Sequence, residues 1–550
     1  MAERKASELF VECLEAEGVK HVFGIPGEET LDLNESLEDS SITFVPVRHE
    51  QGGAYMADMY GRLTRRAGVC LGTLGPGATN LITGVADAFL DRSPLVALTG
   101  QADLERMHKE SHQHIDIVSM FQPVTKWNVR LYSSRVIPEV VRKAFKVAQA
   151  QKPGPTHIEL PEDVMAEWVD AEPLPSRMRI RRPEPSGREL LEAVAVIRGA
   201  ANPIVLAGNG VARVGAADAL REFARATGIG VAETFMGKGL LDYEDPRALG
   251  TVGLQSCDYA LAGFDDADVV ITVGYDLVEH APKNWNPRRD KRIVSIDTAA
   301  AEVDEHFMTE VELVGDLYHI LSRLAEELRD CDFGARAGNS RLNDIALGRF
   351  EAARSDDGFP MQPPRALWEI RQALGPQDML ISDVGLHKLW IARMFPAHEP
   401  DTVMIANGLA GMGIALPAAI AAKLVHPERR VVTVNGDGGF LMNVQELETA
   451  VRLRTPIVNV LWENNQFGSI VWKQDKKFGR HFGTDFTNPD FVRLADSFGM
   501  PSWRIEAVDD FGPTLRRALD LDVPSLIVLP IDYSLDVAIS EELGTETVAA

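Results

Sequence analysis

Two polar clusters in the last third of the chain have the residue types of a magnesium site. Asp437 lies among the glycines that follow the apolar run VVTVN, and Asn464 and Asn465 follow the apolar run PIVNVLW. One carboxylate, one amide oxygen and one backbone carbonyl form half of the octahedral shell that Mg²⁺ prefers, and phosphate oxygens with water can complete it. Gly436, Gly438 and Gly439 let the backbone approach a phosphate closely. The pattern indicates a site for magnesium and a phosphorylated ligand.

The spacing places both clusters in one strand–helix–strand unit. Residues 431–436 and 456–462 are apolar, β-branched runs, and residues 440–454 have apolar positions at helical spacing. Because open parallel sheets bind ligands at the carboxyl ends of their strands, we expect Asp437 and Asn465 to converge. The helix N-terminus after the glycines also favours an anion. The alternative is an ordinary turn and an ordinary loop, but this spacing and context favour the site.

This unit resembles the signature of the thiamine diphosphate enzymes, in which GDG is followed at a similar distance by NN. The resemblance implies that Asp437, Asn465 and the backbone carbonyl of Phe467 would be the metal ligands. The cofactor diphosphate would supply further ligands, so that an acidic chain can bind an anionic cofactor without a basic patch.

A glutamate in the first block supplies the second piece of chemistry. Glu50 follows the strand-like run ITFVPV and begins a segment of small residues. By the resemblance, its carboxyl group bonds N1′ of the aminopyrimidine and favours the imino form that removes the proton from thiazolium C2. Taken alone, an acid at a helix start, worth about 0.3–1 kcal/mol, explains Glu50 better. Beside the GDG–NN unit, the catalytic interpretation is stronger.

Four further segments resemble loops of the family. Gly24–Gly27 resembles its GxPG loop, Thr73–Asn80 its SGPGATN loop, Asp383–His387 its DVGQH diphosphate segment, and Asn407–Gly413 its GLGTMG stretch. By the resemblance, Met412 wedges between the two cofactor rings, although filling a core gap is the simpler role for a methionine. The implied cofactor-binding residues are Pro26, Glu50, Pro76, Asn80, Val384, Gly385, Leu386, His387, Gly408, Met412, Gly436, Asp437, Gly438, Gly439 and Asn465.

The resemblance covers essentially the whole chain and is closest to the acetolactate synthase group. Val273–Asn286, Leu389–Arg393 and Glu446–Leu453 are similar to its catabolic, FAD-independent branch. Gly274–Glu279 stands where the biosynthetic branch has a GARFDDR-like segment, which disfavours bound FAD and leaves it open. In the middle block, Gly208–Gly210 lacks the third glycine of a dinucleotide fingerprint and is a weak signal for a nucleotide site.

A polar loop after the strand-like segment ending at Gln101 contains His108, His112 and His114. Their irregular spacing argues against a metal site. In the catabolic synthases a His-Gln pair occupies this loop near the reacting carbon, which makes His112 and Gln113 candidate catalytic residues. A solvated loop histidine explains His112 equally well. The candidate substrate contacts are Gln101, His112 and Trp472.

The fold class is α/β, with three open parallel-sheet domains. Polar or Pro-rich stretches at residues 172–187 and 336–364 divide the chain, and in each block short β-branched runs alternate with helical patterns. We expect a pyrimidine-binding domain over residues 1–172, a Rossmann-like middle domain over 188–336 and a diphosphate-binding domain over 364–540.

The composition agrees with a cytoplasmic, multidomain enzyme. The chain has 550 residues and a formal net charge of −25, which makes it a poor binder of nucleic acid or of an anionic membrane. Cys13, Cys70, Cys257 and Cys331 are far apart, which excludes a disulfide framework or a cysteine zinc site and fits a reducing compartment. The first residues predict an amphipathic helix rather than a signal peptide, and no apolar run predicts a membrane span.

The expected activity is thiamine diphosphate- and Mg²⁺-dependent decarboxylation of a 2-oxo acid, with pyruvate as the first candidate. Carboligation to a second carbonyl compound would then give 2-acetolactate or a related 2-hydroxy-3-oxo acid. In the family Glu50 faces the diphosphate domain of a partner chain, which implies a homodimer or homotetramer.

Competing hypotheses remain open. The nearest alternative is a different thiamine enzyme. It could be a plain 2-oxo-acid decarboxylase, an FAD-using oxidase or an enzyme like carboxyethylarginine synthase. A nicotinamide dehydrogenase would leave the GDG–NN unit unexplained, and a silent regulatory homologue would not need Glu50, Asp437 and Asn465 together. Glu28 and Glu29 stand where a lysine is frequent in catabolic synthases, and Ala410 stands where a glutamine is frequent. These departures leave the donor and acceptor open.

Overall fold

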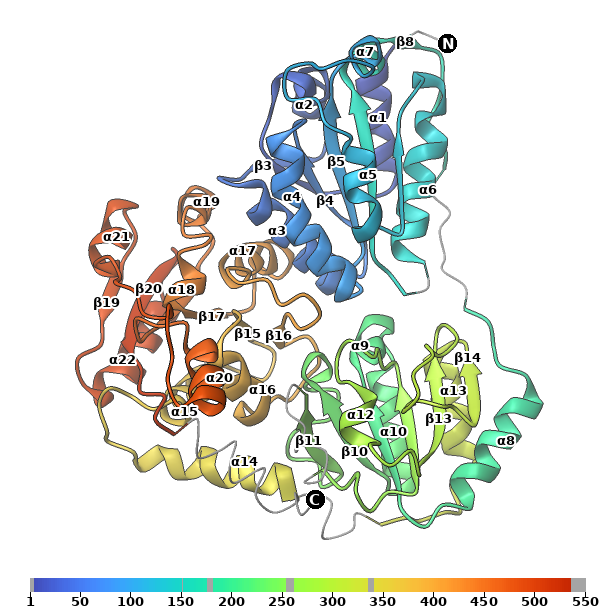
Figure 1. The fold of residues 1–550 in the computed structure, drawn as a ribbon, viewed down its shortest axis with the longest axis vertical. Coiled ribbons are helices and arrows are strands. Elements are labelled where there is room, and N and C mark those ends of the chain that lie inside the picture. Colours follow the sequence, from blue (N-terminus) through green and yellow to red (C-terminus); the bar gives the residue numbers. More distant parts are fainter. Residues whose placement is uncertain (1–3, 151, 176–181, 254–261, 335–340, 536–550) are drawn as a thin grey trace. The chain divides into compact units, whose positions relative to one another are not determined.

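The computed structural model describes residues 4–150, 152–175, 182–253, 262–334 and 341–535 (Figure 1). It contains three six-stranded sheets whose strands all pair in parallel, which confirms the expected α/β class. The chain forms two compact units. Unit 1 is Met1–Ile180, Gly408–Glu428 and Leu441–Thr455; unit 2 is Arg181–Asn407, Arg429–Phe440 and Pro456–Ala550.

Unit 1 is built on the first sheet. The strands, in spatial order, are β3 (Thr43–Pro46), β2 (His21–Gly24), β4 (Gly68–Gly72), β5 (Leu95–Gln101), β7 (Pro155–Pro161) and β6 (Trp127–Arg130). The helices are α1 (Ala6–Ala16), α2 (Leu31–Glu38), α3 (Glu50–Thr64), α4 (Pro76–Leu90), α5 (Ile117–Phe121), α6 (Ile137–Gln149), α7 (Glu162–Ala166), α17 (Ala415–Val425) and α19 (Glu446–Leu453). A short antiparallel pair, β1 (Arg4–Lys5) and β8 (Trp168–Val169), lies apart from this sheet. The fully buried runs β4 and β5 are typical of parallel strands covered on both faces.

Unit 2 contains the other two sheets. The middle sheet has the order β11 (Ala248–Val252), β10 (Gly230–Thr234), β9 (Pro203–Ala207), β12 (Val269–Val273), β13 (Arg292–Asp297) and β14 (Val311–Val314). Its helices are α8 (Gly187–Arg198), α9 (Asn209–Val214), α10 (Ala217–Thr227), α12 (Pro282–Trp285) and α13 (Leu317–Glu327). The third sheet has the order β16 (Val403–Ile405), β15 (Met379–Ser382), β17 (Val431–Gly436), β18 (Ile457–Glu463), β20 (Ser525–Pro530) and β19 (Ser502–Arg504). Its helices are α14 (Arg341–Ala352), α15 (Pro363–Ala373), α16 (Leu386–Met394), α18 (Asp437–Phe440), α20 (Gly468–Phe478), α21 (Phe491–Ser497) and α22 (Val508–Leu519).

Each sheet has a central place where the chain leaves two neighbouring strands in opposite directions; in the first and third sheets the edge strands β6 and β19 are also out of sequence order. The central places lie between β2 and β4, between β9 and β12, and between β15 and β17. Ligands of open α/β sheets bind at the carboxyl ends of the strands beside such a reversal. The fold therefore offers three candidate crevices, one for each sheet.

Two segments differ from the sequence expectation. The helix expected over residues 440–454 exists only as α19, because Leu441–Gln445 forms turns between α18 and α19. Buried Asn443 takes part in these turns and donates a hydrogen bond to the carbonyl of Gly413. The stretch 336–364, expected to be a linker, contains α14, whose Phe350 is buried in the core of unit 2.

Candidate active site

Glu50 lies at the edge of the first sheet where its parallel strands end, as expected. It follows β3 as the first residue of α3, and its side chain is only 7% exposed. Nδ2 of Asn80, from α4, donates a 2.9 Å hydrogen bond to Oε2 of Glu50. A Cβ on Gly77 would come within 3.3 Å of Oε1, so the glycine gives the carboxylate room. The structure therefore brings together Glu50 and Asn80, two of the predicted residues of unit 1.

A second buried glutamate holds the turn before Glu50. Oε1 of Glu446, at the start of α19, accepts hydrogen bonds of 3.0 Å from the backbone N–H groups of both Arg48 and His49. Burial raises the pKa of Glu446, while Thr449 and the two amides act in the opposite direction. The part that Glu446 plays in this turn could not be predicted from the sequence, because Glu446 and Arg48 are 398 positions apart.

The predicted loops after β2 and β4 pack against each other. Thr73 leaves no space for a Cβ on Gly27, and Pro76 begins α4. Gly75 has φ +54°, and a Cβ there would lie 2.7 Å from the carbonyl oxygen of Gln113. The structure thus brings Gln113 to the turn before Pro76. Pro26 is exposed beside these loops.

The histidine loop contacts the buried side chain of Gln101. His112 is exposed, whereas Nδ1 of His114 lies 3.1 Å from Oε1 of Gln101. Gln101 is fully buried, and its amide also bonds to the carboxylate of Glu159 and to the carbonyl of Ile115. These contacts tie the histidine loop to the first sheet through the Gln101 side chain, and its contact with a substrate stays a prediction.

Glu28 and Glu29 lie beside a small acidic cavity of about 330 Å³ in unit 1. Its acidic lining residues are Glu28, Glu29, Asp32, Asp103, Glu162 and Asp163. Oε2 of Glu29 accepts a 2.7 Å hydrogen bond from the hydroxyl of Thr73, which ties it to the loop after β4. Burial raises the pKa of both Glu162 and Asp163.

Asp437 lies where the strand order of the third sheet reverses. It follows β17 and is 1% exposed. Its Oδ2 accepts backbone hydrogen bonds from Asn464 at 3.0 Å and from Asn465 at 2.6 Å, and its Oδ1 accepts one from Gly438 at 2.9 Å. The predicted convergence of the two strand ends is therefore observed at the level of the backbone of Asn464 and Asn465.

Asn488 completes this cluster and was missed by the sequence analysis. Its Nδ2 donates to Oδ2 of Asp437 at 2.9 Å and to Oδ1 of Asn465 at 3.0 Å. It thereby links the carboxylate and the amide that were predicted as metal ligands. The third predicted ligand, the carbonyl of Phe467, already accepts hydrogen bonds from the N–H groups of Ile470 and Val471 at the start of α20.

The loop after β15 supplies a buried imidazole. His387 is 2% exposed, burial lowers its pKa to about 4, and its Nε2 has no hydrogen-bond partner among the described residues. A Cβ on Gly436 would lie 3.2 Å from this ring, and one on Gly439 would lie 2.7 Å from Oδ2 of Asp383. Val384, Gly385 and Leu386 connect β15 to α16 in the same loop. An unpartnered buried ring nitrogen and close glycine backbone fit a polar ligand such as the diphosphate.

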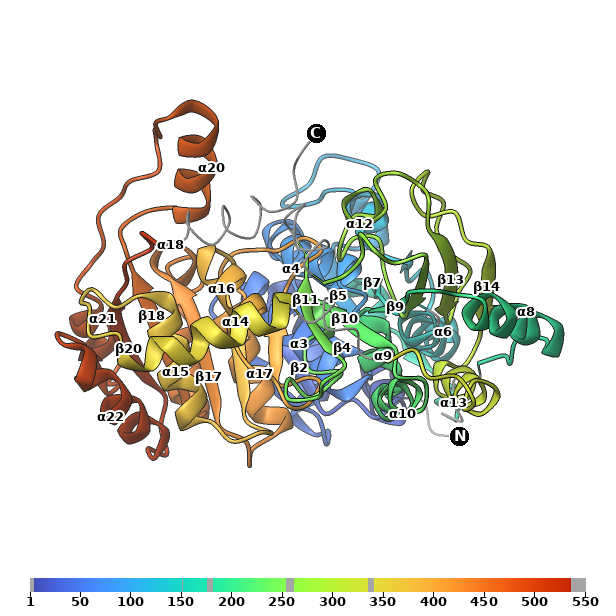
Figure 2. The same cartoon turned by 90° about the horizontal axis from the view of Figure 1, so that it is seen from below.

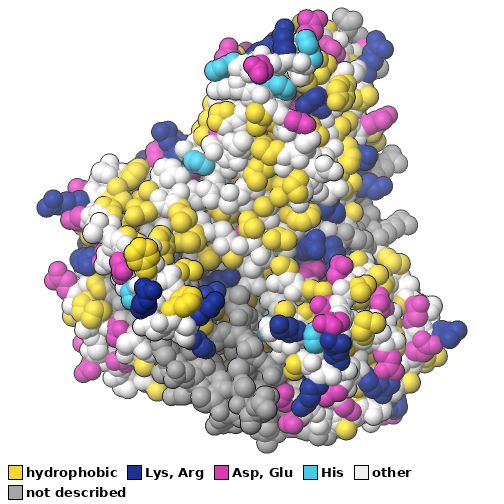
Figure 3. All heavy atoms as spheres, viewed as in Figure 1, with side chains coloured by type: hydrophobic (Ala, Val, Ile, Leu, Met, Phe, Trp, Pro, Cys, Tyr) yellow, Lys and Arg dark blue, Asp and Glu magenta, His cyan; other side chains and the backbone are white. Residues whose placement is uncertain are grey.

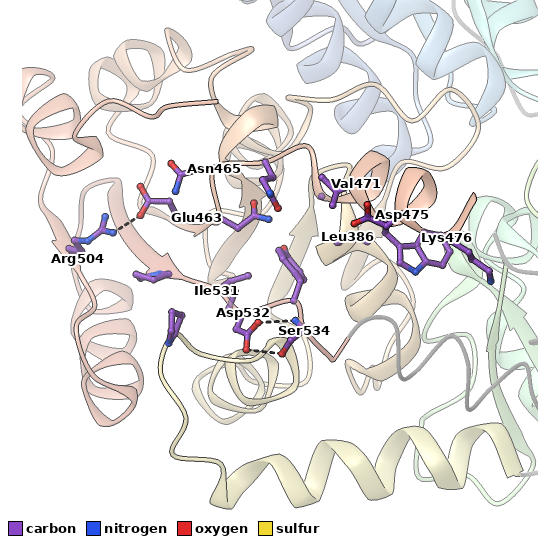
Figure 4. Close-up of a pocket in the computed structure, with 17 residues that line it drawn as sticks. Leu386, Glu463, Asn465, Val471, Asp475, Lys476, Arg504, Ile531, Asp532 and Ser534 are labelled. Carbon is purple, nitrogen blue, oxygen red and sulfur yellow. Dashed lines mark hydrogen bonds and ion pairs between the residues drawn. The ribbon is translucent and has the colours of Figure 1, made fainter. Parts of the chain in front are cut away.

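A cavity of about 800 Å³ adjoins this cluster (Figure 4). Leu386, Asn464, Asn465 and the predicted substrate residue Trp472 are among its lining residues. Its volume lies in the range of small-molecule sites, about 300–1,000 Å³. Trp472 belongs to α20, a helix without buried residues that projects from the rest of unit 2 in Figure 2.

Gly408 and Met412, also predicted at the cofactor, lie in unit 1. The N–H of Gly408 donates a 2.6 Å hydrogen bond to Oδ1 of Asp91, and Met412 is half-buried four residues later.

The crevice of the middle sheet is filled by protein groups. The N–H of Gly210 donates a 2.8 Å hydrogen bond to the carbonyl of Gly274, so the loops after β9 and β12 are in direct contact. The carboxylate of Glu279 accepts the backbone N–H of Asn209 at the start of α9 and the hydroxyl of Thr234. These donors are the groups that a phosphate would use at a helix start.

Two features of the described residues limit other kinds of site. No group of three or more His, Cys, Asp or Glu side chains in this part of the chain could hold a metal ion, so a metal at Asp437 needs amide or backbone oxygens. None of the described helices is both long and apolar enough to cross a membrane.

The three parts of the chain match three parts of one enzyme family. Residues 4–120, 190–324 and 383–529 match the thiamine pyrophosphate enzyme N-terminal TPP binding domain, central domain and C-terminal TPP binding domain, respectively. The motif-based resemblance is thereby confirmed.

Individual relatives extend over nearly the whole chain. Acetolactate synthase of Bacillus subtilis (strain 168) is 35% identical over 553 residues, which cover 98% of this chain and 96% of that protein. The catabolic acetolactate synthase of Raoultella terrigena is 36% identical over 533 residues, covering 96% and 95%. The large subunit of acetolactate synthase isozyme 2 of Escherichia coli (strain K12) is 33% identical over 527 residues, covering 95% and 94%. The chain therefore belongs to the acetolactate synthase family of thiamine diphosphate enzymes.

Proposed function

We propose that this enzyme decarboxylates pyruvate and joins the remaining two-carbon unit to a second pyruvate, giving 2-acetolactate. The observation that carries the proposal is the buried carboxylate of Glu50 at a strand end, with Asn80 bonded to it, in a chain whose relatives are acetolactate synthases. When bound, thiamine diphosphate supplies a carbon nucleophile and an electron sink for the electrons left by CO₂.

We assign the chain's own groups the following roles. Glu50 holds a proton at the pyrimidine ring of the cofactor, with Asn80 orienting the carboxyl group. Asp437 and the amide oxygen of Asn465 hold Mg²⁺, and Asn488 orients them. The Phe467 carbonyl stays a proposed third donor. Apolar groups of the adjoining cavity, Trp472 among them, exclude water from the reacting carbon.

We propose that the enzyme works without FAD. In support, the start of α9 in the middle crevice is already bonded within the protein, because the Glu279 carboxylate accepts the Asn209 N–H. Direct contact between Gly210 and Gly274 also closes the space beside it.

For assembly and location we propose a cytoplasmic homodimer or homotetramer. Cys13 and Cys70 are buried free thiols, as expected for a reducing compartment; Cys257 lies outside the described residues. Basic and acidic side chains are interspersed on the face drawn in Figure 3, which supports small-molecule substrates rather than a nucleic-acid partner. The domain limits 1–172, 188–336 and 364–540 stay a prediction.

The decisive experiment is product analysis with a panel of 2-oxo acids. With thiamine diphosphate and Mg²⁺, pyruvate should give acetolactate, identified by mass, and omission of either should abolish the product. Acetaldehyde would instead indicate a plain decarboxylase, and hydrogen peroxide an oxidase. Formation of another 2-hydroxy-3-oxo acid from mixed substrates would redefine the acceptor.

A further inference from the structure

The loop that carries Met412 is bonded to one buried carboxylate in α4, Asp87, and to another just after α4, Asp91. The N–H of Gly408 donates to Oδ1 of Asp91 at 2.6 Å, and the N–H of Gly411 donates to Oδ1 of Asp87 at 3.1 Å. Both carboxylates are at most 2% exposed. Hydrogen bonds to buried charged groups are stronger than neutral ones and costly to remove. The first residue and the middle of loop 408–413 are thus held from α4 and its C-terminal end.

The loop backbone is constrained at its other positions as well. Ala410 has φ +57°, a left-handed conformation that is unfavourable for a residue with a Cβ. The carbonyl of Gly413 accepts a 2.9 Å hydrogen bond from the buried side chain of Asn443. Such backbone strain persists only where the surroundings over-determine the conformation.

Neighbouring side chains also explain why residues 408 and 411 are glycines, because neither position has room for a Cβ. A Cβ on Gly408 would lie 2.6 Å from Cβ of Leu90 and 2.7 Å from Oδ1 of Asp91. A Cβ on Gly411 would overlap the hydroxyl group of Tyr55 in α3. The loop therefore has little room to shift as a body, and α17, which follows it, packs against α3.

The carboxylates belong to a larger buried cluster around one guanidinium. Arg62 forms ion pairs with Asp58 and Asp91, and its Nη2 lies 3.7 Å from Oδ2 of Asp87. Burial, together with the neighbouring Asp91 and Asp58, raises the pKa of Asp87 well above its ordinary value. When Asp87 is protonated, its carbonyl oxygen can still accept the hydrogen bond from the N–H of Gly411. The side-chain oxygen of an asparagine would accept the same bond.

We propose that Asp87 and Asp91 are positioning residues of the reaction: they hold loop 408–413 in one conformation, so that Met412 is preorganised for the cofactor. The inference rests on the proposed thiamine diphosphate-dependent function and on the position between the cofactor rings that the family resemblance implies for Met412. The two hydrogen bonds that hold the loop, however, are a property of the cofactor-free protein. A loop that is already fixed before the cofactor binds loses less conformational entropy on binding, so binding costs less free energy.

The test compares Asp87→Ala, Asp87→Asn and Asp58→Asn in the full-length protein without cofactor. Hydrogen exchange of the amides in residues 408–413 should be about tenfold faster in Asp87→Ala, as expected when a buried hydrogen bond is lost. Asp87→Asn keeps the acceptor and should exchange like the wild type. Asp58→Asn changes the same cluster without touching the loop, and should also match the wild type there.

A second readout uses thiamine diphosphate and Mg²⁺. Proton NMR of quenched samples in D₂O measures how fast the C2 proton of the bound cofactor exchanges. Asp87→Ala should slow this exchange and lower kcat with little change in KM for pyruvate, and Asp87→Asn should restore both.

Unchanged amide exchange in Asp87→Ala, or the same increase in Asp58→Asn, would overturn the proposal. If the wild type makes no acetolactate, the proposed function fails, yet the amide exchange still reports on the hold.

Discussion

At the scale of single residues, Glu50 is the side chain whose replacement separates binding from chemistry. Glu50→Gln keeps the size of the side chain and its contact with Asn80 but removes the acid. We expect a loss of about 10²–10⁴-fold in the rate of acetolactate formation, the range for a lost general acid–base group. Cofactor affinity, measured by fluorescence titration, should change much less. The exposed Glu28→Gln is the matched control, and full carboligation by Glu50→Gln would exclude the assigned role.

Asn488 gives a second residue-scale prediction. Because its Nδ2 contacts both Asp437 and Asn465, Asn488→Ala should weaken metal binding by about 10–100-fold, as for other residues that orient metal ligands. Titration with Mn²⁺ in the presence of thiamine diphosphate measures the affinity. Gln474→Ala, on exposed α20, is the control. Equal affinities in the two variants would remove Asn488 from the metal site.

Sequence patterns predict residues that follow a strand directly but not residues that reach a site from elsewhere. Glu50 and Asp437 were predictable because each comes just after an apolar run. Asn488 contacts Asp437 across 51 positions, through a loop with no periodic signal. Likewise, the position of Gln101 at a strand end does not reveal that Glu159 and His114 contact its side-chain amide.

At the scale of elements, the strands were predictable and the connections were not. The apolar runs ITFVPV, VVTVN and PIVNVLW form strands β3, β17 and β18, because strands buried on both faces require such runs. Apolar spacing over residues 440–454 suggested one helix, yet Asn443 bonds to Gly413 and interrupts it. The polar stretch containing α14 shows too weak a pattern to be recognised as helix.

The buried Glu279 beside β12 gives a prediction for pH. Burial, together with the charge of Asp276, raises the pKa of Glu279 to about 8. The pKa of a glutamate in an unfolded chain is about 4.3. Between these values the folded state binds the extra proton, so this group lowers stability as pH rises from about 5 to 8. Glu279→Gln removes the titration, and its stability relative to the wild type should increase through that window.

Urea denaturation of both proteins across the window measures this difference. The slope should not exceed about 1.4 kcal/mol per pH unit, the value for one proton. The exposed Glu139→Gln should show no such slope. A parallel dependence on pH in the wild type and Glu279→Gln would contradict the assignment.

At the scale of the whole molecule, the proposed assembly predicts complementation between two inactive variants. If each active site combines Glu50 of one subunit with Asp437 of another, a Glu50→Gln chain and an Asp437→Asn chain form mixed dimers with one intact site. Co-expression should then recover up to about a quarter of the wild-type activity, for random pairing in a twofold-symmetric dimer. Absence of any recovery, with mixed dimers demonstrated by mass spectrometry, would place both residues in one chain's site.

The interleaving of the two units has a consequence for synthesis. In unit 1, α3 packs against α17, and Glu446 bonds the turn before Glu50. These partners belong to segments that are synthesised much later and end at Thr455. Residues 181–455 take roughly 14–55 s to translate at about 5–20 residues per second. During that interval the first sheet leaves the ribosome with an apolar helix face uncovered. We therefore expect chaperone capture of nascent chains to end only after residue 455 has emerged.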